Sequence, residues 1–176
     1  MKITKSNGEY LELRNLDYES LKIKEDEFNW LYILFSVQNE YMKWWEIDAC
    51  MTSSDLKRLA DWFKDLSFGY TIEDLFFTNE QYFHFELLSK NESTMTIKVC
   101  FIQHLAPTYF HENGIECFIT FDLTSSELKQ ISDSLERDYL NTPIRNLDRI
   151  YLNIPSREDR KKNKENPTIN QKIIIE

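Results

Sequence analysis

The chain reads Met51-Thr52-Ser53-Ser54-Asp55-Leu56-Lys57 at one point and Leu123-Thr124-Ser125-Ser126-Glu127-Leu128-Lys129 at another. Each stretch predicts the start of a helix, because a threonine N-cap followed three residues later by an acidic residue forms a capping box. The apolar residues at the N′ and N4 positions form a hydrophobic staple in both copies. The acidic residue also meets the positive end of the helix dipole. The repeated stretch is therefore interpreted as scaffold.

The residues around each stretch predict a strand that leads into a helix. Strand-like runs precede the two copies at 44–50 and 115–123. After each copy the apolar residues recur at helical spacing, which predicts amphipathic helices from Ser53 to about Leu66 and from Ser125 to about Asn141. The strand-then-helix unit therefore occurs twice.

Further strands are predicted from alternating, β-branched and aromatic runs at 9–13, 28–37, 41–49, 70–77, 81–88 and 94–104. A three-residue turn at 38–40 would pair Ile33 with Trp45 and Leu31 with Ile47. A turn centred on Asn91 would pair Phe83 with Val99, Phe85 with Ile97 and Leu87 with Met95.

The strand at 28–37 is apolar on both faces, since Trp30, Tyr32 and Leu34 alternate with Leu31 and Ile33. A single sheet with helices on one side would leave one set of these side chains in water. We therefore predict an α+β fold with a mostly antiparallel, strongly curved sheet or two packed sheets, and two amphipathic helices alongside. Residues 1–142 are expected to form a single domain, followed by a charged, partly flexible C-terminal extension at 143–176.

Composition excludes several classes of protein. Only three of the 176 residues are glycine, so the chain has no glycine-rich phosphate loop. It also has neither an apolar run long enough to cross a bilayer nor an apolar N-terminal secretion signal. Catalytic motifs such as H-E-x-x-H or a nucleophile elbow do not occur. The sequence thus predicts a cytoplasmic protein that is not an enzyme and does not bind a membrane.

Charge is spread unevenly along the chain. Residues 1–142 hold 13 Lys+Arg against 25 Asp+Glu, a net charge of −12, whereas residues 143–176 hold 8 against 5, a net charge of +3. An acidic body repels nucleic acid and attracts basic partners. We therefore expect no nucleic acid partner.

Metal and cofactor sites are not indicated either. Cys50, Cys100 and Cys117 have no metal-binding spacing and are expected to be buried, reduced thiols. The histidines are equally scattered, and no cysteine or carboxylate pattern completes a zinc site around His104 and His111. The sequence predicts no metal and no cofactor.

The order of these elements resembles the WapI-type immunity proteins of bacterial contact-dependent toxin systems over about residues 8–142. The resemblance is carried by the residues 27–31, by the helix that contains Leu56, Leu59, Trp62, Phe63 and Leu66, by the run 75–80 leading into 82–85, and by the strand 121–123 before the helix at 125–141. The resemblance implies a small cytoplasmic protein that binds and neutralises a cognate toxin domain, in many cases a nuclease, without a cofactor.

The predicted binding site combines carboxylates with aromatic anchors on the strands that lead into the two helices. Its residues are Trp44, Glu46, Asp48, Glu116, Phe118 and Asp122, all expected on outward strand faces. The sequence is also compatible with two other functions. One is a small-ligand-binding or accessory protein with an aromatic-lined cavity, and the other is a hydrolase whose carboxylates converge in a cleft.

Overall fold

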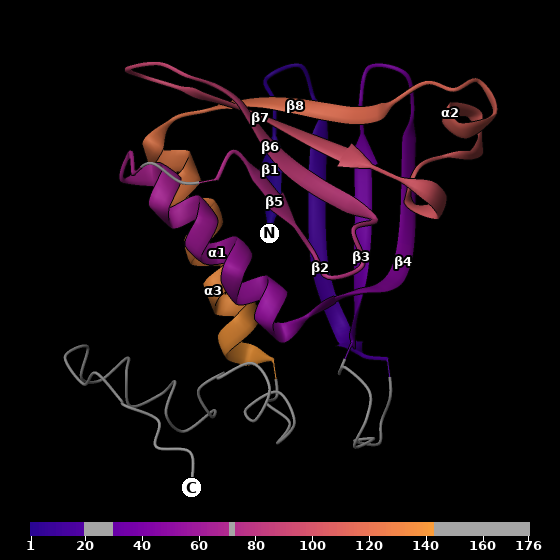
Figure 1. Ribbon diagram of the computed structural model, residues 1–176, viewed down its shortest axis with the longest axis horizontal. Coiled ribbons are helices and arrows are strands. Elements are labelled where there is room, and N and C mark those ends of the chain that lie inside the picture. The colour runs from indigo at the N-terminus through magenta and orange to yellow at the C-terminus, as the bar shows by residue number, and fades with distance from the viewer. Residues whose placement is uncertain (20–29, 71–72, 143–176) are drawn as a thin grey trace, which may run out of the picture.

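The computed structural model describes residues 1–19, 30–70 and 73–142. The predicted C-terminal extension at 143–176 lies outside these residues, as does the start of the strand predicted at 28–37. Within them the chain forms two four-stranded antiparallel sheets and two long helices, which confirms the predicted α+β fold with packed sheets (Figure 1).

Each sheet is built from strands that are consecutive in the chain. Sheet A has the order β1-β2-β3-β4 and sheet B has the order β5-β6-β7-β8. The strands of sheet A are β1 (Lys2–Thr4), β2 (Tyr10–Tyr18), β3 (Trp30–Gln38) and β4 (Lys43–Thr52). The strands of sheet B are β5 (Leu75–Phe77), β6 (Phe83–Lys90), β7 (Met95–Phe101) and β8 (Cys117–Leu123). The long helices are α1 (Ser53–Ser67) and α3 (Ser125–Asn141), and the short 3-10 helix η1 (Gln103–Leu105) and helix α2 (Thr108–Glu112) lie between β7 and β8.

The core lies between the two sheets and under the helices. Phe35 of β3 meets Phe83 of β6 edge-to-face, with ring centroids 4.9 Å apart, so the inner faces of the sheets touch. Phe63 of α1 packs against Phe85 of β6 in the same manner at 5.4 Å. Helices α1 and α3 lie side by side on one flank (Figure 1), where the Ser132 hydroxyl donates to the Ala60 carbonyl at 2.7 Å.

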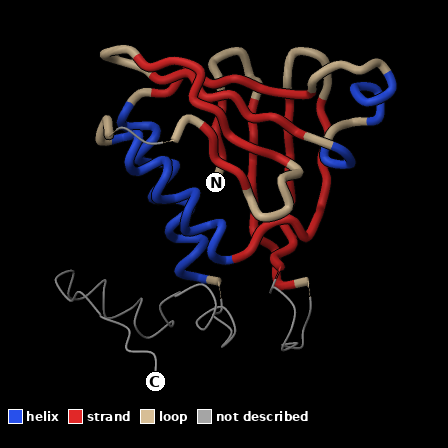
Figure 2. Tube along the Cα trace, viewed as in Figure 1, coloured by secondary structure: helices blue, strands red, loops and turns tan. Residues whose placement is uncertain are grey.

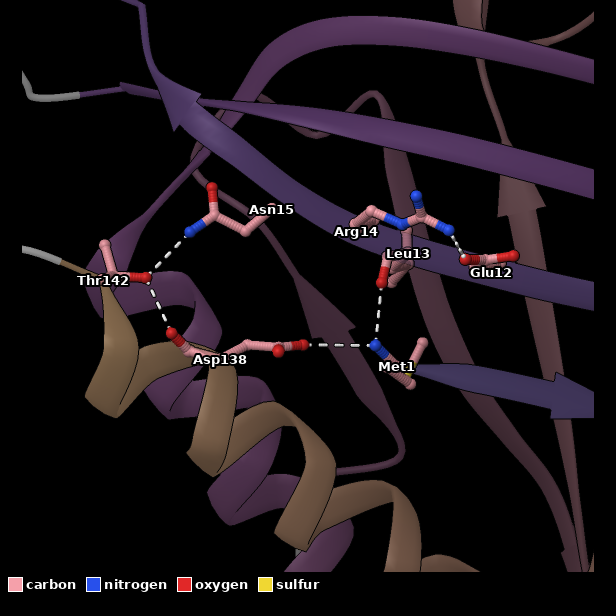
Figure 3. Close-up of polar contacts among 7 residues, drawn as sticks. All are labelled: Met1, Glu12, Leu13, Arg14, Asn15, Asp138 and Thr142. Atoms are coloured by element: carbon pink, nitrogen blue, oxygen red, sulfur yellow. Dashed lines mark hydrogen bonds and ion pairs between the residues drawn. The ribbon is translucent and has the colours of Figure 1, made fainter.

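Contacts between α3 and sheet A hold the helix to the strands. The Met1 amine donates to the Leu13 carbonyl and pairs with the Asp138 carboxylate at 3.2 Å (Figure 3). Beside it the Asn15 amide donates to the Thr142 hydroxyl at 2.8 Å. These bonds link the end of α3 to β2, directly through Asn15 and also through Met1, the residue before β1.

Both predicted capping boxes are present. Strand β4 passes directly into α1 (Figure 2), where the Asp55 N–H donates to the Thr52 hydroxyl and the Thr52 N–H donates to the Asp55 carboxylate at 2.9 Å. At α3 the Thr124 N–H donates to Glu127 at 2.8 Å. The two boxes differ in burial, because Thr52 and Asp55 are fully buried whereas Thr124 and Glu127 are exposed.

Burial also accounts for the titration of Asp55. Desolvation raises the pKa of its carboxyl above the usual range, although hydrogen bonds from Thr52 and the charge of Arg58 oppose the shift. Its oxygens are taken up by the capping box and by the Arg58 guanidinium at 3.1 Å. The raised pKa is therefore a property of the helix cap and not the mark of a catalytic cleft.

The difference in burial predicts unequal effects of removing the two cap hydroxyls. Thr124→Ala should lower the free energy of unfolding by about 1 kcal/mol, the ordinary cost of losing an N-cap. Thr52→Ala should cost about 2 kcal/mol, because it also takes a donor from a buried carboxylate. Urea unfolding measures both values, and Thr52→Ser, which keeps the hydroxyl, is the control. Equal losses at the two positions would contradict the role given to burial.

The registers of the two predicted hairpins differ from expectation. In the β6–β7 hairpin Phe85 lies opposite Val99 and Leu87 lies opposite Ile97, two positions from the predicted partners. An even shift keeps every side chain on its predicted face. In the β3–β4 hairpin Ile33 lies opposite Asp48 rather than Trp45, a shift of three positions. An odd shift reverses the faces of β4, and this error changes the predicted binding site.

Candidate functional site

The six predicted contact residues do not form one surface. Those of β4 lie on the edge of sheet A, and those near β8 lie on the edge of sheet B. Because paired residues in antiparallel strands share a face, the register decides where each side chain points. The two groups therefore have to be placed separately.

The prediction that Trp44 is an exposed anchor is wrong. Trp44 lies opposite Val37 on the inner face of sheet A, and its side chain is 9 % exposed. Its indole N–H donates to the Leu105 carbonyl at 3.1 Å, and its ring packs against Phe101 with centroids 5.5 Å apart. Trp44 is thus a core residue that joins the edge of sheet A to the segment after β7.

Glu46 and Asp48 also follow the inner face of sheet A, since they lie opposite Phe35 and Ile33. Glu46 is nevertheless exposed. The Asp48 carboxylate is 3.0 Å from the His104 imidazole in η1. These two carboxylates therefore line the free edge of β4 and do not face outward with the β8 group.

The β8 group has the geometry that the sequence predicts. Phe118 and Asp122 alternate with the buried Ile119 and Phe121 and therefore lie on the outer face of sheet B. Phe118 is 42 % exposed, and Glu116, directly before the strand, is exposed as well. The Asp122 carboxylate accepts from the Thr96 hydroxyl at 2.7 Å. Their role in binding stays a prediction.

Phe118 belongs to a larger apolar and charged surface, which we call the outer face of sheet B. Two rows of paired residues define it: Phe77, His84, Cys100 and Phe118 in the first, and Leu75, Glu86, Lys98 and Thr120 in the second. Leu75, Phe77 and Phe118 are its exposed apolar members. The aromatic side chains thus lie among carboxylates and one lysine.

Lys98 is a cation on this face that contacts two carboxylates and one aromatic ring. Its ammonium is 2.7 Å from Glu116 and 3.9 Å from Glu86, and it lies over the Phe118 ring at 4.8 Å from the centroid. The hydrogen bond from Lys98 lowers the pKa of the Glu116 carboxyl. Both carboxylates are therefore partly neutralised by a residue of their own face.

His84 and Cys100 form the less exposed part of the face. Burial lowers the pKa of the His84 imidazole, which favours its neutral form, and raises the pKa of the Cys100 thiol to about 12. The ligand atoms of His84, Glu86 and Cys100 all lie within 4.8 Å of one another. These are residues that could hold a metal ion. The sequence analysis missed them because the pairing of β6 with β7 brings Cys100 next to His84 and Glu86, which lie more than ten positions earlier in the chain.

A groove of about 360 Å³ borders the outer face of sheet B, between α1 and β5. Trp62, Phe76 and Phe77 supply its aromatic side chains, and the Trp62 indole donates to the Glu73 carbonyl at 3.0 Å. Three carboxylates line the groove together with Arg58: Asp61, Asp65 and Glu73. An aromatic floor with a carboxylate rim suits the side chain of an incoming lysine or arginine.

The outer face of sheet A is a second exposed apolar surface, which the sequence assigned to the core. It carries Trp45, Ile47 and Tyr32, and Trp45 is 64 % exposed. The cations Lys2 and Lys43 lie over the ring of Tyr10 on this face. A face with two lysines over one ring is less suited to a basic partner than the outer face of sheet B, where Lys98 lies among carboxylates.

Comparison with known protein families gives a match over most of the chain. The sequence model of the immunity protein WapI-like family matches residues 2–143. No curated protein matches the chain. Across the residues that the structure describes, no helix has the length and apolar character needed to cross a membrane.

Proposed function

Because the chain belongs to the WapI-like immunity protein family, we propose that it neutralises one cognate bacterial toxin domain by stoichiometric protein–protein binding. The proposal includes a cytoplasmic site of action, a single domain at 1–142 and no catalysis by the chain itself. It also includes a basic toxin, such as a nuclease with a positively charged substrate channel.

We assign the contact surface to the outer face of sheet B and the adjoining groove. The observation that supports this choice is Phe118, a half-exposed aromatic side chain held on a rigid strand between Glu116 and Asp122. Aromatic side chains on rigid elements make strong anchors because they lose little conformational freedom on binding. Leu75 and Phe77 extend the apolar area toward the groove.

Charge complementarity favours this surface over the outer face of sheet A. Glu86, Glu116 and Asp122 lie on it, and the groove adds Asp61, Asp65 and Glu73 at its border. Carboxylates at the rim of an interface speed the encounter with a basic partner and help to exclude wrong partners. The surface therefore combines exposed apolar side chains on β5 and β8 with carboxylates on β6, next to and on β8, and in the adjoining groove.

The remaining predicted contact residues are given different roles. Trp44 is left out of the contact surface because it is buried. Glu46 and Asp48 lie on the free edge of β4, where they add to the negative field of the body without contacting the outer face of sheet B.

The test is co-expression of the chain with the toxin domain encoded in the neighbouring reading frame. The chain should restore growth, and purified toxin should lose activity in proportion to added chain, with complete loss at one equivalent. Raising the salt concentration from low to physiological strength should slow association markedly and change dissociation little, because screening weakens long-range attraction more than contact.

Two results would contradict this function. Failure to protect cells from the neighbouring toxin would remove the immunity role. Loss of toxin activity at far less than one equivalent would instead mean that the chain acts by catalysis. An association rate independent of salt would leave immunity intact but overturn the acidic contact surface.

A further inference from the structure

His84 of β6, Glu86 of β6 and Cys100 of β7 present one nitrogen, one oxygen and one sulfur ligand on the outer face of sheet B. Their ligand atoms all lie within 4.8 Å of one another. The register explains the proximity, because His84 lies directly opposite Cys100 and Glu86 is the next residue on the same face of β6. Neighbouring strands of one sheet hold the three groups, so their spacing is fixed by backbone hydrogen bonds.

A fourth ligand lies next to this group. The Glu116 carboxylate is 3.4 Å from the Cys100 sulfur. Imidazole, thiolate and carboxylate are the ligands that zinc uses, at about 2.0–2.3 Å and in tetrahedral arrangement. Donors that are a few ångströms apart before binding need only small side-chain movements to reach those distances.

The imidazole of His84 has a free coordinating atom. Among the described residues, its Nδ1 is buried and makes no hydrogen bond. A buried polar atom without a partner is costly, and coordination to a metal removes that cost.

The same place already attracts a cation. The Lys98 ammonium lies 2.7 Å from Glu116 and 3.9 Å from Glu86 and thereby balances two neighbouring carboxylates. A divalent ion would take over this role, and the long lysine side chain can turn away into solvent. Lys98 and a metal ion therefore compete for one position.

From this arrangement we propose that His84, Glu86, Cys100 and Glu116 form a binding site for a single zinc ion on the outer face of sheet B. Binding transfers the thiol proton of Cys100 to solvent, and the resulting thiolate, the imidazole and the two carboxylates hold the ion. Displacement of Lys98 would also uncover the ring of Phe118, over which its ammonium now lies.

The test uses the full chain freed of metal by dialysis against a chelator, and it needs no toxin. Calorimetric titration with Zn²⁺ should give one ion per chain. Titration with Co²⁺ should give the visible bands of a tetrahedral site together with a sulfur-to-cobalt charge-transfer band. His84→Ala and Cys100→Ser should each weaken zinc binding by about 100-fold or more. Loss of a residue that only hydrogen-bonds to a metal ligand already weakens binding by up to about 100-fold, and loss of the ligand itself should cost at least as much.

Two sets of variants distinguish a site from nonspecific binding. His111→Ala and Cys117→Ala remove the same residue types elsewhere in the fold and should leave zinc affinity unchanged. Lys98→Met removes the competing cation and should tighten zinc binding, which a merely structural role of Lys98 would not do. If Cys100→Ser does not fold, Glu86→Gln supplies the ligand deletion.

Three results would overturn the proposal. The first is absence of zinc binding by the metal-free chain. The second is binding that survives both His84→Ala and Glu86→Gln. The third is a cobalt complex without the sulfur charge-transfer band. None of these results bears on neutralisation of a toxin, so the zinc site and the immunity function fail or stand separately.

Discussion

Replacing Trp44 with alanine is expected to lower the free energy of unfolding by about 3–5 kcal/mol, the range for removal of a large buried aromatic side chain. The indole fills the space between Phe101 and Phe110, with ring centroids 5.5 Å and 6.5 Å away. Its loss also leaves the Leu105 carbonyl without the indole N–H as its donor. Chemical denaturation of the full chain measures the effect.

Trp45→Ala is the matched control for this change. Trp45 is the next residue along β4, but it lies on the outer face of sheet A and is 64 % exposed. Its removal should change stability by no more than about 0.5 kcal/mol, as expected for an exposed position without special contacts. A larger loss for Trp45 than for Trp44 would mean that the faces of β4 are assigned the wrong way round.

Replacing Phe118 with alanine is expected to weaken binding of the cognate toxin by about 2 kcal/mol or more, the threshold of a binding hot spot, or roughly 30-fold. The side chain is half exposed, so truncation removes contact area for the partner and leaves little cavity in the core. The effect should appear mainly as faster dissociation. Surface plasmon resonance with the purified toxin domain separates the two rate constants.

Trp45→Ala serves as the control here too, because it removes an exposed aromatic side chain from the outer face of the other sheet. It should leave toxin affinity unchanged. If Trp45→Ala weakens the complex and Phe118→Ala does not, the outer face of sheet A is the contact surface. A circular dichroism melt of each variant shows whether a loss of affinity reflects a loss of fold.

The helices can be predicted from the sequence because their first residues form hydrogen bonds with near neighbours in the chain. Thr52 with Asp55, and Thr124 with Glu127, form capping boxes that depend on residues only three positions apart. The fold class can be predicted from the strands that are apolar on both faces, because each of those faces has to be covered by another sheet or helix. Both signals depend on near neighbours or on composition, so tertiary contacts elsewhere in the chain do not change them.

Strand register depends on turn geometry, which the composition of the strands does not reveal. The Asn39 side chain accepts from the N–H groups of Tyr41 and Met42 in a turn at 39–42, which begins one residue later and ends two residues later than the one predicted at 38–40. The odd shift that results buries Trp44 and exposes Trp45. The outer face of sheet A is itself apolar, so the hydrophobic pattern of β4 cannot identify the buried side.

The grouping of His84, Glu86 and Cys100 could not be predicted for a related reason. The expected hairpin placed His84 opposite Lys98, whereas the structure pairs it with Cys100. Next to the turn the register is offset by three positions, and the bulge between Leu87 and Ser89 reduces the offset to two. A register shift of two residues therefore decides whether His84 lies opposite a lysine or opposite a potential metal ligand.

The halves of the molecule repeat one another in more than their helix starts. In each half a four-stranded meander is followed by a capped helix, and the two helices pack together. Either half in isolation would expose the helix face that the other half now covers. Because one chain carries both halves, their association does not depend on protein concentration, as it would in a dimer of separate units.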